Sequence, residues 1–170
     1  MGIRYYAYAF DSENTEQVLM DPLGFVSRDP LADAWGMEPG ATIGYPTFKQ
    51  STPERDMLYL DKAWRQLQWL TGPSAEGRDA RPAFRMFEGE VTMHYDGWES
   101  WIRALTPAEM VAIAEDLETI SEDTMRVQGT TTSCALLDSD AEYAIPYLRR
   151  ARTFVRALAD EGRGMVYLIG

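Results

Sequence analysis

Few side chains of this sequence are suited to acid–base, nucleophilic or metal chemistry. Among its 170 residues His94 is the only histidine and Cys134 the only cysteine. A single histidine excludes a metal site with two histidine ligands. The sequence also has no G-x-S-x-G motif, which would supply a serine nucleophile to work with His94. We interpret His94 as an ordinary strand residue and Cys134 as a small buried thiol. The sequence therefore predicts no catalytic residue, no metal site and no cofactor.

Two polar segments have some features of ligand sites. Alternating carboxylates at Asp138, Asp140 and Glu142 resemble the start of a hard-cation loop, but the glycine and the distal glutamate of a calcium loop do not follow. Carboxylates are also expected in the first turn of a helix. The hydroxyl-rich run 129–133 lacks the Gly-Lys-Ser/Thr of a phosphate-binding loop, and we interpret it as an exposed loop.

Arginines give the last predicted helix a basic face, made of Arg149, Arg150, Arg152 and Arg156. Such a face could hold a phosphate or a carboxylate of a ligand. We favour the alternative, because charged helix faces are usually solvated or paired. The expected partners are acidic residues of another helix, such as Glu115, Asp116 and Glu118.

Tryptophans are the best indication of a recognition surface. Trp64 and Trp69 lie five residues apart on one predicted helix, so they cannot face the same way, and one of them must be exposed or covered by a loop. Tryptophan is enriched in binding surfaces as well as in cores. We therefore take Trp64, Trp69, Trp98 and Trp101 as candidate binding residues.

Composition and charge limit the possible partners. The hydrophobic content of 45% and the length fit one globular domain over residues 1–170. The net charge of −11 disfavours nucleic acid and anionic membrane surfaces and favours a cationic protein partner. No apolar run is long enough for a membrane span, and no signal peptide opens the chain, so we expect a cytoplasmic protein.

The first half of the chain predicts one strand, one long irregular segment and one strong helix. Aromatic and β-branched residues indicate a strand over 3–10, followed by a helix from Ser12 to about Met20. Residues 22–53 are rich in proline and glycine and predict a long loop with one short helix at Pro30–Trp35. The apolar spacing over 57–70 predicts a helix, with Asp61 as its cap and 57–60 as an extended lead-in, or with a start at Thr52.

The second half predicts a hairpin, two capped helices and a last strand. Residues 84–87 and 91–95 flank Glu88-Gly89 as the two arms of a hairpin. Capping boxes begin at Thr106 and Ser139, with a polar stretch over 122–138 between the two helices. Residues 165–169 form a terminal strand. These elements predict the mixed α+β (α/β) class, with helices packed on a central mixed sheet.

The run Leu60-Asp61-Lys62-Ala63-Trp64, followed by Leu67 and by Leu70-Thr71-Gly72, resembles the central motif of the YfbM-like family of uncharacterised bacterial proteins. The opening Met1-Gly2, the segment 105–110 and the closing helix and strand are similar to that family as well. The resemblance implies a single-domain α/β fold and no activity. Family members commonly carry histidines where this chain has Arg65 and Gln68, which argues against transferring any catalytic role.

Two functional hypotheses follow. The first is a non-catalytic binding or interaction module, in one form neutralising a basic protein. The second is a small-molecule enzyme or sensor, with a pocket between Asp61–Trp64 and the segment 22–53 in which Asp61 and Arg65 hold a polar ligand. The tryptophans named above serve either hypothesis.

Overall fold

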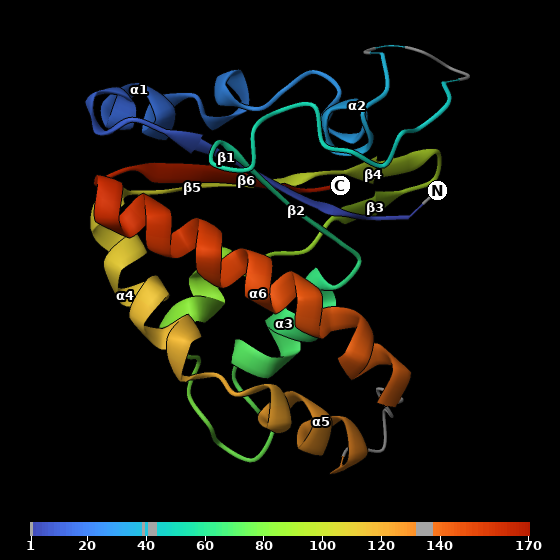
Figure 1. Cartoon of the computed structure of the whole chain (residues 1–170), viewed down its shortest axis with the longest axis vertical. Coiled ribbons are helices and arrows are strands. Elements are labelled where there is room, and N and C mark those ends of the chain that lie inside the picture. The colour runs from blue at the N-terminus through green and yellow to red at the C-terminus, as the bar shows by residue number, and fades with distance from the viewer. Residues whose placement is uncertain (1, 39, 41–43, 132–137) are drawn as a thin grey trace.

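The structure is a computed structural model that describes the whole chain except residues 1, 39, 41–43 and 132–137 (Figure 1). Its centre is a four-stranded sheet in the order β2 (Met57–Asp61), β1 (Tyr5–Phe10), β6 (Gly164–Ile169) and β5 (Trp101–Leu105). All three strand pairs are antiparallel. The predicted α+β class is confirmed, whereas the mixed pairing predicted for the sheet is wrong.

Helices cover both faces of this sheet (Figure 1). One face carries α3 (Trp64–Thr71), α4 (Pro107–Thr119) and the long α6 (Asp138–Glu161), with α5 (Glu122–Thr131) packed on α6. This side holds the main core, in which the strand residues Tyr5, Leu60 and Tyr167 are fully buried. The other face carries α1 (Thr15–Met20) and α2 (Pro30–Trp35) over two smaller clusters.

Short elements connect these layers. Single 3-10 turns lie at Ser12–Asn14, Pro22–Phe25 and Pro82–Met86, and β3 (Thr92–His94) pairs with β4 (Gly97–Glu99) in a small hairpin. In the part of the chain that the structure describes, no helix is both long and apolar enough to cross a membrane.

Of the two predicted capping boxes, the one that begins at Thr106 is confirmed. The side chain of Glu109 accepts from the backbone N–H of Thr106 at 2.8 Å, which completes the capping box that begins α4. Asp29 caps α2 by accepting from the N–H of Ala32 at 3.0 Å, and α2 has the predicted bounds.

Four sequence predictions need correction. Residues 57–61 form strand β2, so the helix begins only at Trp64, and Asp61 does not cap it. Residues 82–86 form a 3-10 turn that begins at a proline, so the hairpin is β3–β4 rather than 84–95. The polar stretch contains a helix, α5, and residues 101–105 form the unpredicted strand β5.

Candidate functional site

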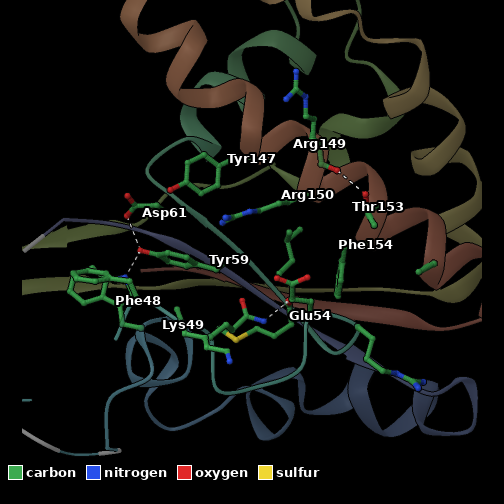
Figure 2. Close-up of a pocket in the computed structure, with 17 residues that line it drawn as sticks. Phe48, Lys49, Glu54, Tyr59, Asp61, Tyr147, Arg149, Arg150, Thr153 and Phe154 are labelled. Carbon is green, nitrogen blue, oxygen red and sulfur yellow. Dashed lines mark hydrogen bonds between the residues drawn. The ribbon is translucent and has the colours of Figure 1, made fainter. Parts of the chain in front are cut away.

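A cavity of about 840 Å³ lies at the edge of the sheet, beside β2 (Figure 2). Its walls come from both layers of the fold: α6 on one side, and α2 with residues 48–50 on the other. The strand between them contributes Met57 and Tyr59 from one face of the sheet and Leu58 from the other. The cavity therefore wraps around the open edge of β2.

Aromatic rings line much of this cavity. Trp35 packs on Phe48 with ring centroids 5.6 Å apart, and the indole Nε1 of Trp35 donates to the Tyr59 hydroxyl at 3.1 Å. Tyr147 and Phe154 line the α6 wall. Phe48 is 73% exposed, so its ring stands at the rim. These rings offer flat apolar contact to a ligand.

Half of the charged residues of the lining already have ion-pair partners. The guanidinium of Arg149 donates to both carboxylate oxygens of Glu122, at 2.7 and 2.8 Å. Arg55 lies 3.7 Å from Asp56 and 3.5 Å from Glu161. The positive charge of both arginines is therefore balanced within the protein.

Lys49, Glu54 and Arg150 are different, because none of these lining residues has an ion-pair partner among the described residues. The guanidinium of Arg150 lies 5.4 Å from the centre of the Tyr147 ring, in cation–π contact. Figure 2 shows the Arg150 side chain extending from α6 toward the side of the cavity where Tyr59 and Asp61 lie. Two cations and one carboxylate are thus left for a ligand.

Asp61 joins three segments of the chain at one end of the cavity. One carboxylate oxygen accepts from Arg4 Nε and from the Tyr59 hydroxyl, both at 2.9 Å, and the other accepts from the Tyr143 hydroxyl at 2.7 Å. Both oxygens are used, so the carboxylate links Arg4, which precedes β1, to β2 and α6. This position suits a structural role at the wall better than direct ligand contact.

The electrostatics of this network follow from its geometry. Burial alone would raise the pKa of Asp61, but the bonds from Tyr143 and Tyr59 and the charge of Arg4 outweigh it and hold that pKa below its ordinary value. Burial and the bond to Asp61 raise the pKa values of Tyr59 and Tyr143. Asp61 therefore stays ionised and both tyrosines stay neutral near pH 7.

Backbone strain is concentrated at the same cavity. Among the described non-glycine residues, only Phe48 (φ 55°) and Asp61 (φ 46°) have positive φ, and both line it. Such conformations persist only where the surroundings enforce them, and they are common at ligand sites.

The other candidate residues lie away from the cavity lining. Trp64 is buried in the main core, and its Nε1 has no hydrogen-bond partner in the described part of the chain. Arg65 is exposed, with its guanidinium 5.5 Å from the Trp64 ring centre. Trp69 is 42% exposed; Trp98 on β4 and Trp101 on β5 are each 38% exposed. Of the six candidates, only Asp61 lines the cavity.

Part of the basic face pairs as expected. Arg156 Nε lies 2.8 Å from Glu118, and Arg152 donates to the backbone carbonyls of Leu117 and Ile120. Glu122, which the sequence reading did not name, binds Arg149. Arg150 is the member of this face that points into the cavity.

The remaining polar motifs give no gathered site. His94 is exposed and lies 3.7 Å from Glu99. Cys134 and residues 132–133 of the hydroxyl-rich run lie outside the described residues, and nothing is described of the Asp138 and Asp140 side chains. Where the structure describes the chain, no group of three His, Cys, Asp or Glu side chains is placed to hold a metal ion.

Sequence reasoning missed Lys49, Tyr59 and the position of Arg150 in the cavity lining. Lys49 lies in the proline-rich segment 22–53, which was expected to border a pocket, but no local pattern singles it out. Tyr59 lay in the predicted extended lead-in over 57–60, or inside the helix if it began at Thr52, and neither alternative marked it as a binding residue.

Comparison with known proteins places this fold in a family. A solved structure of YfbM from Escherichia coli, described as a protein of unknown function, matches with a TM-score of 0.55 at 20% identity over 99% of this chain and 100% of that chain. At that identity the match concerns the fold alone. No curated protein matches the chain. A family model described as a domain of unknown function, DUF1877, matches residues 1–168, so the chain belongs to the DUF1877 family.

Proposed function

We propose that this protein is a non-catalytic binding module whose cavity beside β2 holds a ligand with one anionic group and an apolar part. The observation that carries the proposal is the pair of cations, Lys49 and Arg150, that face an aromatic cavity without a carboxylate partner among the described residues. A guanidinium over an aromatic ring keeps its N–H edge available to a carboxylate, sulfonate or phosphate.

The network around Asp61 supports binding rather than catalysis. A general acid or base works best with a pKa near the working pH. The pKa of Asp61 lies below its ordinary value and those of Tyr59 and Tyr143 lie above theirs, so these groups are poorly suited to exchange protons near pH 7. They are suited to keeping one wall of the cavity rigid.

Two further proposals concern the partner and the location of the protein. The overall charge of −11 motivates a cationic protein partner, which would bind outside this cavity because the cavity lining carries more cations than carboxylates. We also propose a cytoplasmic location.

The test is a titration with 8-anilinonaphthalene-1-sulfonate, an anion with an aromatic body, followed by its fluorescence. Arg150→Gln is expected to weaken binding about tenfold, which corresponds to ~1.4 kcal/mol and to the loss of one exposed charge-assisted contact. Arg65→Gln is the matched control, because it removes the same charge from an exposed helix position outside the cavity. Equal affinities for the two variants would refute the proposal.

A further inference from the structure

The open side of β2 has the geometry of a vacant strand position. Among the described strands, β2 has a neighbour only on its β1 side. Ala7 pairs with Leu58, and the N–H of Ala9 donates to the carbonyl of Asp56 at 2.9 Å. Hydrogen bonds alternate in direction along a strand, so Leu58 bonds toward β1 while Met57 and Tyr59 direct their N–H and C=O groups toward the cavity.

A side chain already imitates a neighbouring strand at one end of this edge. Gln50 donates from its amide nitrogen to the carbonyl of Met57 at 3.1 Å, and the N–H of Met57 donates to the carbonyl of Pro53. The outward groups of Met57 are therefore satisfied. Those of Tyr59 take part in no turn, loop or side-chain hydrogen bond among the described residues.

The length of the cavity along β2 matches that of a short extended segment. Tyr147, Arg150, Phe154 and Ala157 recur at three- and four-residue spacing and form one stripe of α6 along the cavity. From the first to the last of them the helix rises about 15 Å. The five residues of β2 span about 13 Å. A segment of four or five residues would fill this length.

We propose that the ligand is an extended peptide segment that adds as a strand to the open edge of β2 and places one acidic side chain at Arg150. This inference rests on the proposed binding function and specifies its ligand class. Backbone hydrogen bonds to Tyr59 supply alignment, and side chains of the segment reach the aromatic walls on either side.

The charges of the lining specify a single acidic side chain. The positive charges of Arg150 and Lys49 attract a carboxylate, whereas the negative charge of Glu54 would repel a second carboxylate elsewhere in the cavity. The net charge of −11 also repels a polyanionic segment as a whole. An acidic residue flanked by uncharged, β-forming residues fits these constraints best.

The experiment uses the full chain labelled with 15N and a pool of acetylated, amidated pentapeptides with glutamate in the middle and Val, Thr, Ile or Phe elsewhere. In the free protein, the Tyr59 amide is expected to exchange its hydrogen at least tenfold faster than the Leu58 amide, which faces β1. The peptides are expected to slow exchange at Tyr59 at least fivefold. Replacing the central glutamate with lysine should weaken binding about tenfold in the wild type and have a smaller effect in Arg150→Gln.

N-methylation of the peptide backbone separates a strand from any other occupant. Methylated peptides keep their side chains but lose N–H donors, and at least a tenfold weaker affinity is expected. Unchanged affinity, or an unprotected Tyr59 amide, would overturn the inference. If the sulfonate probe binds through Arg150 and no peptide protects Tyr59, the inference fails while the proposed function stands; if neither binds, both fail.

Discussion

Replacing Asp61 tests whether the carboxylate holds the end of the cavity together. Asp61 accepts hydrogen bonds from Arg4, Tyr59 and Tyr143 and sits at φ 46°. Asn tolerates this backbone conformation but has no charge. Gly also accepts the conformation but has no side chain to accept hydrogen bonds. Ala likewise lacks the accepting oxygens, and it is strained at positive φ. The three substitutions therefore separate the hydrogen-bond contribution from the backbone contribution.

The structure gives an expected order of stability losses. A hydrogen bond to a charged group contributes about 1.5–3 kcal/mol when buried, and this network is partly exposed, so we expect roughly 2 kcal/mol from the three donors together. Ala adds about 1 kcal/mol for its positive φ. Asn, which can still accept from the hydroxyls, is expected to lose about 1 kcal/mol, Gly about 2 and Ala about 3.

Thermal unfolding followed by circular dichroism measures these losses. For a chain of this size 1 kcal/mol corresponds to roughly 2–4 °C, so Ala is expected to melt about 6–12 °C below the wild type. Gly melting below Ala would refute the backbone argument. A wild-type melting temperature for all three variants would refute the hydrogen-bond argument.

The pH dependence gives an independent check. The folded-state pKa of Asp61 is depressed, so its contribution is fully present above the ordinary carboxyl pKa near ~4 and is lost as the pH falls through the lower folded value. The gap between the wild type and Asp61→Asn is therefore expected to be constant from about pH 5 to 7 and to shrink below about pH 4. A gap that widens in acid would contradict the assignment.

Two further predictions concern the core and the loop that precedes β3. Trp64→Phe is expected to change the free energy of unfolding in urea by at most about 1 kcal/mol, because removing the unpartnered Nε1–H offsets the lost volume, while Trp64→Ala costs about 3–5 kcal/mol. A loss for Trp64→Phe well above about 1 kcal/mol would show that the indole N–H is satisfied in solution. Gly89→Ala is expected to cost at least about 2 kcal/mol in thermal melts, because φ is 122° and the new Cβ would lie 2.4 Å from the Trp101 ring. In the double variant with Trp101→Ala, the steric part of the Gly89→Ala loss should disappear and the part due to the positive φ should remain. Stability losses of the two single variants that add up strictly in the double variant would contradict the contact.

The sequence predicted those elements whose signal is local. The capping box at Thr106 and the Asp-Pro start of α2 each place a cap and its partner within three residues, and both helices begin where expected. Strand β2 was partly misassigned because Leu60, Trp64 and Leu67 share helical spacing although Leu60 belongs to the strand. Pairing with β1 decides whether these residues follow the strand or the helical periodicity, and the local sequence does not show that pairing.

The candidate site was harder to predict because it depends on which charges neutralise each other at long range. Arg149 and Arg150 are adjacent and identical in type, yet Arg149 binds Glu122, 27 residues away, and Arg150 faces the cavity. Neighbouring residues of α6 point about 100° apart around the helix axis, so the two arginines face different surroundings. The packing of α5 on α6 determines which of them reaches Glu122. The sequence could therefore indicate a basic helix face and a pocket beside Asp61, whereas Arg150, the proposed binding residue, is distinguished only once the helices are packed on the edge of β2.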